Sequence, residues 1–533
     1  MRYNQILQEG KKVLNHENAE AYALTNELEL YTLVCTMALQ PKFYESPIEQ
    51  VQRVASLVAQ CDHEFVAKLA IYARQEMYLR SVPLLLVVEL AKVHSGDDLV
   101  SRTIEKVVMR ADEIMELLMC YQWRNPQQGV KKLCKLSHQV QVGLQKAFNR
   151  FDEYQFAKYD RDNLNVKLRD ALFIVHPKPK DEAQQAIFDK IVSGKLEIPY
   201  TWETELSALG QKEDCCDEDK RNKWAELINS GKLGYMALLR NLRNILDVQV
   251  DYDVLNTVIE RISNPYEVAK AKQFPFRYFS AYKEIKGYEA KTESDLQTAL
   301  IDLGLGEHKK DNSGNLMLSA LENAVISSVS HIEGFNENTK VMIATDMSGS
   351  MCHPISAKSK IQYYEVGILM SMLLRNCCNK VVTGIFGDEW KVIDLPKDNI
   401  LQNTDAIANR IGEVGYGTLG NKPLRWLIEN KIVVDKVMYF TDMQFWEGTR
   451  CYNTILKCSY IDNTFANLWN EYKKISPQAR LYLFDLAGYG YAPISIPRED
   501  VTLIAGWSDK IFTIMQSIEN GSEALAKVQS IEL

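Results

Sequence analysis

The stretch Lys340-Val-Met-Ile-Ala-Thr-Asp-Met-Ser-Gly-Ser-Met351 decides how the C-terminal part of this chain folds. Its first half is an apolar run of the kind that forms a strand buried on both faces of a parallel sheet. The run ends in three oxygen-bearing side chains at alternate positions, Asp346, Ser348 and Ser350. Ligands of open α/β sheets bind outside the carboxyl ends of the strands, and carboxylate and hydroxyl oxygens suit a hard cation such as Mg²⁺. The stretch therefore predicts a cation site, with a simple polar cap on the next helix as the alternative.

Downstream of this stretch, apolar strands alternate with helical patterns. The expected strands are 381–386, 390–393, 437–440, 481–486 and 501–505, and the expected helices are 361–374, 405–411, 465–472 and 509–518. This alternation requires crossover connections, and hence a mostly parallel sheet with helices on both faces. The domain is Rossmann-like, but it lacks the Gly-x-Gly-x-x-Gly fingerprint and a phosphate-binding Gly-Lys-Ser/Thr loop, so nucleotide binding is not indicated.

Two further polar positions fall at the same edge of this sheet. Thr418 closes the glycine-rich segment 415–418, and Asp442 follows the strand expected at 437–440. An aspartyl phosphatase is the enzymatic alternative for an Asp after a strand, but it normally needs a second Asp two residues further on, where this chain has Ser348. The five positions together predict a metal site without catalysis.

The N-terminal half has a different pattern. From about residue 18 to residue 300 the apolar residues recur with the three-and-four spacing of amphipathic helices, and prolines fall between or near the starts of these runs. Successive helices with short connections predict antiparallel helix pairs stacked as a HEAT-like solenoid, with a generic helical bundle as the alternative. We expect a helical module over residues 1–335 and an α/β domain over residues 336–533.

The composition is that of a folded protein from a reducing compartment. The 533 residues exceed the ~250–300 that one hydrophobic core holds. The 11 cysteines include no Cys-x-x-Cys and indicate neither a disulfide framework nor a zinc site. The longest apolar run, near residues 84–90, is far shorter than the ~20 residues of a membrane span, and the N-terminus lacks a signal-peptide core. We therefore expect a cytoplasmic protein without a membrane segment.

Basic residues gather in parts of the helical half, although the net charge is −8. The segments 124–146 and 231–245 contain Lys and Arg but no acid, and the Lys and Arg of 270–291 are interleaved with Phe and Tyr. Such clusters predict either a surface for phosphates or solvated helix faces with i,i+4 partners. The sequence alone leaves both interpretations open.

The five polar positions at the sheet edge resemble the metal-ion-dependent adhesion site of von Willebrand factor A domains. The resemblance implies that Ser348, Ser350 and Thr418 coordinate a divalent cation directly, expected to be Mg²⁺, while Asp346 and Asp442 act mainly through bound water. The sixth position is then left for a ligand's carboxylate. The chain departs from the pattern at position 416, where a tyrosine replaces one of two consecutive glycines.

Helical repeats followed by such a domain are the architecture of the TROVE-module proteins, the Ro autoantigen family, and four segments carry this resemblance. Residues 233–243 resemble the family's Leu-Arg-Asn-Leu segment, and residues 270–276 resemble its Ala-Arg-x-x-Pro-Phe stretch. Residues 157–159 and 169–178 resemble its basic segment ending in Ser-His-Leu-Lys-Pro. The segment that precedes the first repeat in the family is short here, so we expect ring closure to use other contacts.

The resemblance implies a closed ring of HEAT-like repeats with a positively charged hole. Single-stranded 3′ ends of misfolded noncoding RNA thread that hole in the family, and Y RNA or Y-like RNA binds the outer surface. The residues carried over as RNA-binding are Lys158, Arg161, His176, Lys178 and Arg240.

The implied function is that of a noncatalytic scaffold or chaperone in RNA quality control, expected to be a monomer. An acidic protein ligand, with an exoribonuclease as one candidate, would bind at the metal. The alternative is a metal-dependent protein-interaction scaffold without a direct RNA role. A nuclease ranks third, because the sequence offers no carboxylate cluster or His pair outside the adhesion-type site.

Overall fold

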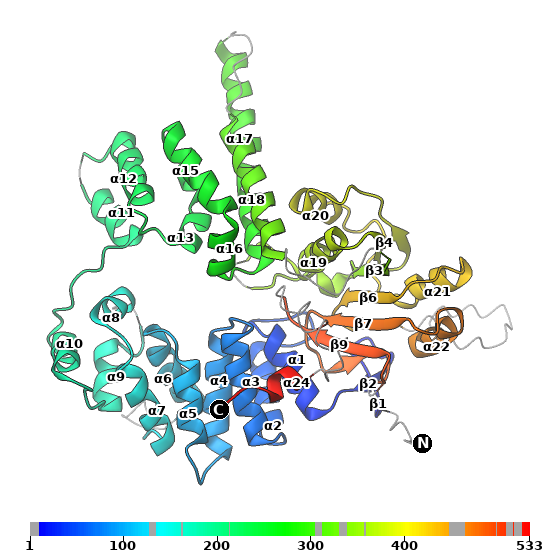
Figure 1. The fold of residues 1–533 in the computed structure, drawn as a ribbon, viewed down its shortest axis with the longest axis horizontal. Helices are drawn as coiled ribbons and strands as arrows, with labels where there is room; N and C mark the ends of the chain where they lie inside the picture. Colours follow the sequence, from blue (N-terminus) through cyan, green and yellow to red (C-terminus); the bar gives the residue numbers. More distant parts are fainter. Residues whose placement is uncertain are drawn as a thin grey trace.

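The computed structural model describes residues 10–126, 135–160, 164–212, 214–303, 312–329, 338–356, 359–446, 464–496, 498–507, 515 and 525–533. Two arms of helices and one α/β domain make up the molecule (Figure 1). The two arms extend from the α/β domain and are joined at their far end by the connection between α10 and α11. The helical half is thus arranged as a ring that the α/β domain completes.

The first arm contains ten helices among the described residues. They are α1 (Asn26–Thr36), α2 (Pro47–Val58), α3 (His63–Gln75), α4 (Ser81–Val93), α5 (Leu99–Val107), α6 (Asp112–Arg124), α7 (His138–Phe148), α8 (Glu153–Tyr159), α9 (Leu168–Val175) and α10 (Glu182–Ser193). The helices of the second arm are α11 (Trp202–Gly210), α12 (Asp217–Asn229), α13 (Tyr235–Arg240), α14 (Leu242–Asp247), α15 (Tyr252–Ser263), α16 (Pro265–Ala271), α17 (Pro275–Leu303) and α18 (Ser313–Val329).

Side-chain caps fix where these helices begin. The Ser46 hydroxyl accepts the N–H of Glu49, the Glu49 carboxylate accepts the N–H of Ser46, and Pro47 takes the first position of α2. Asp152 and Gln155 form the same reciprocal pair at the start of α8. The caps satisfy N–H groups that have no partner inside the helix. The predicted series of helices is confirmed.

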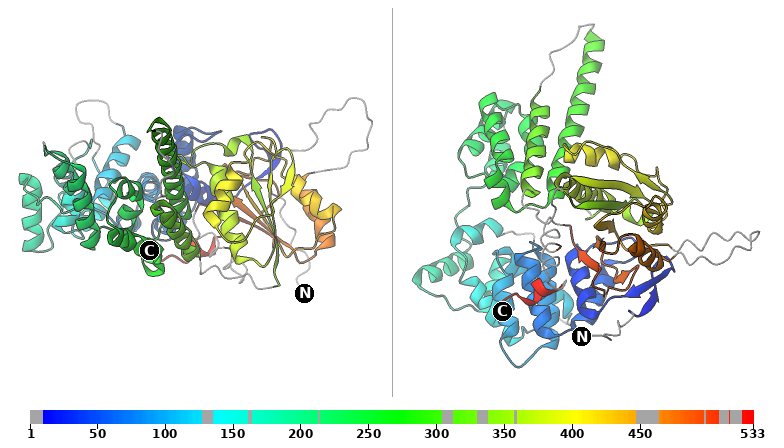
Figure 2. Two further views of the ribbon diagram at one scale, coloured as in Figure 1. Left: turned by 90° about the horizontal axis from the view of Figure 1, so that it is seen from above. Right: turned by 45° about the vertical axis from the view of Figure 1, so that its right-hand side comes forward.

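The α/β domain contains a six-stranded sheet of order β5-β4-β3-β6-β7-β9, in which β5 is antiparallel to β4 and the other pairs are parallel. The strands are β3 (Lys340–Asp346), β4 (Lys380–Phe386), β5 (Trp390–Val392), β6 (Lys436–Thr441), β7 (Arg480–Asp485) and β9 (Val501–Ala505). Its helices are α19 (Tyr363–Cys377), α20 (Ile400–Ala408), α21 (Asn421–Glu429) and α22 (Phe465–Ile475). Helices cover both faces of the sheet (Figure 2), as the alternating pattern predicts.

The N-terminal residues depart from the predicted helical pattern. The short strands β1 (Lys12–Leu14) and β2 (Glu20–Ala23) form a hairpin, and β2 pairs with β8 (Tyr491–Ala492) near the other end of the chain. Helices therefore begin at α1, later than the predicted start near residue 18. Strands of three and four residues carry too little alternation to be found by pattern, and their partner lies far away in sequence.

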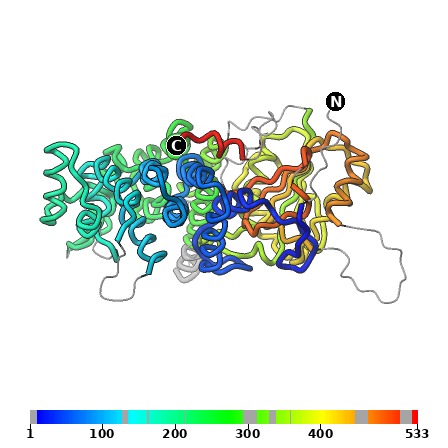
Figure 3. The backbone as a smooth tube through the Cα atoms, turned by 90° about the horizontal axis from the view of Figure 1, so that it is seen from below, coloured from blue at the N-terminus to red at the C-terminus, as the bar shows by residue number. Residues whose placement is uncertain are grey.

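Both ends of the chain cross between the two halves. The N-terminal hairpin lies beside the C-terminal strands, and helix α24 (Ala526–Gln529) returns to pack against α3 (Figure 3). The Lys527 ammonium lies 3.4 Å from the Glu76 carboxylate at this contact. The helix predicted at 509–518 falls almost entirely outside the described residues.

The last helices of the second arm are bonded to the α/β domain. The Lys283 ammonium lies 2.6 Å from the Glu365 carboxylate. The Glu322 carboxylate of α18 accepts the backbone N–H of Gln402 at 2.8 Å in the first turn of α20. A residue of the helical half therefore caps a helix of the α/β domain. In the described part of the chain, no helix is both long and apolar enough to cross a membrane.

Candidate metal centre and nucleic-acid cavity

The central strands deliver the predicted metal-binding side chains to one edge of the sheet. Asp346 ends β3, where its Oδ1 accepts the N–H of Ser348 at 2.9 Å and its Oδ2 accepts the Thr441 hydroxyl of β6 at 2.5 Å. The Ser348 and Ser350 hydroxyl oxygens lie 3.2 Å apart. The buried side chains of this set are Asp346, Ser348, Ser350, Thr418 and Asp442.

The state of Asp442 fits a cation at this edge. Its Oδ1 accepts the N–H of Gln444 at 3.1 Å, but its Oδ2 is buried without a hydrogen-bond partner in the described structure. Burial and, second, the charge of Asp346 raise the pKa of Asp442 to about 8, and burial raises that of Asp346 to about 6. Two buried carboxylates that are costly to ionise side by side are stabilised by a divalent cation between them. Ser348, Ser350 and Thr418 supply the hydroxyl oxygens that such an ion prefers.

The loop that carries Thr418 is held by Asp388, a residue that the sequence pattern did not predict. The carboxylate of Asp388, which follows β4, accepts the N–H of Tyr416 at 3.1 Å and of Gly417 at 3.3 Å. A Cβ atom at Gly415, where φ is +79°, would come 2.0 Å from the same carboxylate. The Tyr416 side chain is 58% exposed, so a tyrosine at this position is accommodated outside the loop.

The turn after β3 also contacts this loop. The Gly349 N–H donates to the Tyr416 carbonyl at 2.8 Å, which brings the Thr418 loop against the turn that holds Ser348 and Ser350. The five predicted metal residues therefore share one edge of the sheet.

A third buried aspartate ends the neighbouring strand β7. Asp485 stands opposite Thr441 in register, its Oδ1 accepts the N–H groups of Ala487 and Gly488, and burial raises its pKa to about 6. The sequence signal was present, because the strand predicted at 481–486 contains this Asp. No cluster of three His, Cys, Asp or Glu side chains that could hold a metal occurs in the described ranges. A cation at this edge would therefore depend on the serine and threonine hydroxyl groups.

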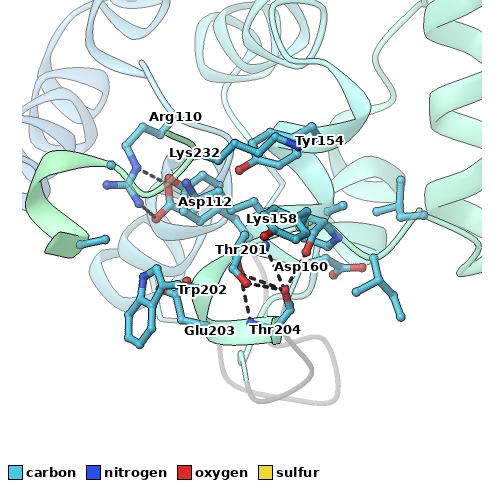
Figure 4. A pocket seen from close by; sticks show the side chains of 18 of the residues that line it. Arg110, Asp112, Tyr154, Lys158, Asp160, Thr201, Trp202, Glu203, Thr204 and Lys232 are labelled. Carbon is cyan, nitrogen blue, oxygen red and sulfur yellow. Dashed lines mark hydrogen bonds and ion pairs between the residues drawn. The ribbon is translucent and has the colours of Figure 1, made fainter. Parts of the chain in front are cut away.

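A cavity of about 1120 Å³ lies between the two helical arms. Its walls come from α6, α8, the α10–α11 connection and α13. In Figure 4 the side chains of Tyr154, Lys158 and Lys232 lie together at this cavity. The Lys158 ammonium is 5.8 Å from the Tyr154 ring centroid, and that of Lys232 is 4.8 Å from the Tyr200 centroid. The cavity thus combines cations with aromatic rings.

The charges around this cavity are balanced. The basic residues that line it are Arg80, Arg110, Lys158, Lys232 and Arg240, and the acidic ones are Asp112, Glu116, Asp160, Glu197 and Glu203. Arg80 and Arg110 both pair with Asp112, at 2.8 and 2.9 Å. No ion pair within the described ranges involves Lys158, Lys232 or Arg240, so these three cations remain available to a ligand.

A smaller cavity of about 360 Å³ adjoins the first and is basic. The two share Met236 and Arg240, and the smaller one is also lined by Arg243 and Arg277, with Glu284 as its one acidic lining residue among the described positions. The surrounding protein atoms and, second, the charge of Arg240 lower the pKa of Arg277. Two guanidinium groups close enough to repel one another stand on this wall.

The structure brings together some of the predicted RNA-binding residues. Lys158 and Arg240 line the same cavity. His176 ends α9 with φ of 49°, Lys178 follows it, and both are exposed in the α9–α10 connection outside the cavity lining. Arg161 lies outside the described residues.

Arg243 and Arg277 are candidate binding residues that the sequence did not predict. The signal for Arg243 was the acid-free segment 231–245, and Arg277 lies in the aromatic-rich basic segment 270–291. Which cations of these two segments face a common cavity depends on the packing of α13, α14 and α17.

A helical-repeat ring joined to a von Willebrand factor A-like domain defines the class of this protein, and comparisons with known families agree. The TROVE domain matches residues 44–194 and 185–312, together half of the chain, and the Ro60 vWA domain matches residues 340–458. The chain belongs to the Ro60 family of TROVE-domain proteins.

The relatives differ from this chain in length and sequence. The RNA-binding protein RO60 of Deinococcus radiodurans is 22% identical over 309 residues, which are 52% of this chain and 54% of that protein. Telomerase protein component 1 of Rattus norvegicus is 23% identical over 369 residues, which are 54% of this chain but only 14% of that protein. The crystal structure of the Deinococcus radiodurans RO (RSR) protein has a TM-score of 0.57 at 17% identity, covering 95% of this chain and 100% of that chain. This structural likeness concerns the fold.

Proposed function

We propose that this chain is a noncatalytic RNA-binding protein that holds the single-stranded 3′ ends of misfolded noncoding RNA in the cavity between its helical arms. It acts as a scaffold or chaperone in RNA quality control. Membership of the Ro60 family and the name of the Deinococcus radiodurans relative, an RNA-binding protein, support this function.

The observation that carries the proposal is a group of three arginines, Arg240, Arg243 and Arg277, that line the smaller cavity and that we call the arginine wall. Arg240 and Arg277 lie close enough for one charge to affect the other, and no described carboxylate forms an ion pair with either. Arg243 stands 3.8 Å from the Glu284 carboxylate, too far for a strong pair. Guanidinium groups bind phosphates through paired N–H donors. A phosphate of the RNA backbone would relieve the repulsion between Arg240 and Arg277.

The larger cavity suits the bases of the same strand. Tyr154 is 48% exposed, and Tyr200 and Trp202 contribute further rings to the lining. Stacking of a base on an aromatic ring is worth about 1–3 kcal/mol and is independent of sequence. Because acidic residues balance the basic ones in this cavity, we expect Lys158, Lys232 and the arginine wall to make most of the phosphate contacts.

Y-like RNA is a second ligand in this proposal and binds the outer surface. His176 and Lys178 are exposed and lie away from the cavity, so they are placed to contact an RNA outside the ring. Phosphate contacts by exposed cations weaken as salt is added.

The edge of the sheet that carries the five predicted metal residues, which we call the metal edge, gives the protein a second binding function in this proposal. Mg²⁺ held by Ser348, Ser350 and Thr418, with Asp346 and Asp442 behind bound water, takes an acidic side chain of a protein partner. A protein-interaction scaffold without an RNA role is the alternative that this edge favours. D346A separates the two, because it removes metal-dependent partner binding and leaves RNA affinity unchanged.

The test is filter binding of a hairpin RNA with a 3′ single-stranded tail at low salt. The double variant R240A/R277A should bind at least about tenfold more weakly than the wild type, since a hydrogen bond to a charged group contributes about 1.5–3 kcal/mol. R102A/K146A is the matched control, because both residues are paired with carboxylates and neither lines a cavity. Wild-type protein that fails to bind the tailed hairpin, or a cavity variant that binds it within twofold of wild type, contradicts the proposal.

A further inference from the structure

The smaller of the two cavities contains one carboxylate beside the arginine wall. Its volume is about 360 Å³, against about 1120 Å³ for the larger cavity. Pockets for small ligands span ~300–1,000 Å³, so the smaller cavity has room for about one nucleotide. Glu284 of α17 is its one acidic lining residue among the described positions. A cavity whose other charges suit phosphate thus contains a group that repels phosphate.

The α/β domain holds the Glu284 side chain by one of its two oxygens. The Lys360 ammonium, which does not line the cavity, lies 2.7 Å from Glu284 Oε1. Oε2 makes no hydrogen bond within the described ranges, and the Arg243 guanidinium is 3.8 Å from it. The side chain is 39% exposed. One carboxylate oxygen is therefore fixed, and the other remains able to accept a hydrogen bond from a ligand.

Two neutral polar side chains line the same cavity. Ser280 lies one helical turn before Glu284 on α17, and its hydroxyl has no hydrogen-bond partner among the described residues. The Asn244 amide nitrogen donates to Asn241 Oδ1 at 2.9 Å, which leaves the Asn244 oxygen to accept. Such groups bond to ribose hydroxyls and to the edges of unstacked bases. The lining therefore offers contacts for a sugar and a base as well as for a phosphate.

A carboxylate at this position distinguishes the last nucleotide of an RNA from those before it. An ionised carboxylate only accepts hydrogen bonds, and ribose hydroxyls donate to such groups in dinucleotide sites. The last ribose carries a free 2′ and a free 3′ hydroxyl, whereas the 3′ oxygen of every earlier ribose carries the next phosphate. A phosphate against Glu284 would place two negative charges together, which is costly. The carboxylate therefore favours a strand that ends here.

We propose that the smaller cavity binds the terminal nucleotide of an RNA with a free 3′ hydroxyl, and that Glu284 selects this end. The inference rests on the proposed function, because it assigns one nucleotide of the same strand. Arg240 and Arg277 bind the last internucleotide phosphate, and Glu284 Oε2 accepts a hydrogen bond from the terminal ribose. RNA cleaved by attack of its own 2′ hydroxyl ends in a phosphate and is a poor ligand.

The test is filter binding of the tailed hairpin RNA to the full chain, with the tail ending in a 3′ hydroxyl or a 3′ phosphate. Wild-type protein should bind the 3′ hydroxyl form at least about tenfold more tightly, the size expected for losing a hydrogen bond to a charged group. The same extra phosphate at the 5′ end of the hairpin is the matched RNA control. It should leave the affinity unchanged.

Variants of Glu284 and of its partner separate recognition from a structural role. E284Q should reduce the preference to about twofold or less, mainly because RNA with a 3′ phosphate gains affinity. K360A breaks the same ion pair but keeps the carboxylate, so it should retain the preference. E260Q, at an exposed position on α15 outside both cavity linings, should also retain it.

The outcomes distinguish this inference from the proposed function. Wild-type protein that binds both RNA ends equally, with R240A/R277A weakening both, shows a strand that continues past Glu284 and overturns this inference alone. A preference that E284Q retains in full, or that K360A loses as E284Q does, overturns the role of Glu284. Wild-type protein that binds neither RNA overturns the proposed function as well.

Discussion

The carboxylate of Asp388 accepts the backbone N–H of Tyr416 at 3.1 Å, and through this bond the residue after β4 fixes the loop that carries Thr418, a predicted metal ligand. Asp388 is exposed and touches none of the predicted metal ligands through a hydrogen bond of its own in the described structure. Its role is to hold the shape of a loop that contains a tyrosine where glycine is common. The proposed metal site therefore depends on a residue outside the five-position pattern.

Removal of this carboxylate should weaken metal binding without removing a ligand. D388A is expected to lower the Mn²⁺ affinity about tenfold, the usual cost of losing a residue that orients a ligand. Calorimetric titration of the full chain measures the affinity. E389A, at the next position and 72% exposed in its side chain, is the control and should bind as wild type does. Equal affinities of D388A and E389A would contradict the assigned role.

The cap that α18 places on α20 should contribute to the stability of the whole chain. E322A leaves the N–H groups of Leu401 and Gln402 without their acceptor, and loss of a helix cap costs about 0.5–2 kcal/mol. Urea denaturation followed by circular dichroism measures the free energy of unfolding. E260A, on the exposed face of α15, is the control and should change it by less than about 0.5 kcal/mol. E322Q keeps an acceptor oxygen, so its free energy of unfolding should lie between those of E322A and E260A.

A buried lysine gives the stability a defined dependence on pH. Burial and, second, the charge of Arg53 lower the pKa of Lys42 to about 7, well below its ordinary value. Because the unfolded chain binds this proton more tightly, the free energy of unfolding should rise with pH above about 7, and this contribution is lost as the pH falls through 7. K42M should abolish the rise between pH 7 and pH 10, measured by urea denaturation at each pH. K220M, at an exposed position, should keep the wild-type slope, and an unchanged slope in K42M would refute the assignment.

The sequence predicted the α/β domain well because its signals are local. Each central strand is an apolar run, and Asp346 and Asp442 stand at or directly after strand ends, where parallel strands place side chains at a common edge. The same reasoning would have found Asp388 and Asp485, which also follow or end strands. The five-position family pattern does not include these two aspartates.

The features that the sequence did not predict depend on contacts between segments that are distant in the chain. The β2–β8 pair joins Tyr22 to Ala492, and nothing local in either short strand indicates the other. The charge of the proposed RNA cavities likewise could not be predicted from the linear sequence. Asp112 pairs with Arg110 at the start of α6, whereas Arg240 and Arg277 become neighbours only through the packing of α13 against α17.

The most direct test of the central claim is to map where a single-stranded RNA tail lies. A hairpin RNA with 4-thiouridine in its 3′ tail is bound to the full chain and irradiated, and the crosslinked peptides are identified by mass spectrometry. The proposed function predicts crosslinks in three regions that line the two cavities, namely 154–160, 232–243 and the residues around Arg277. Crosslinks confined to the α9–α10 connection or to the α/β domain, with none in these three regions, would contradict it.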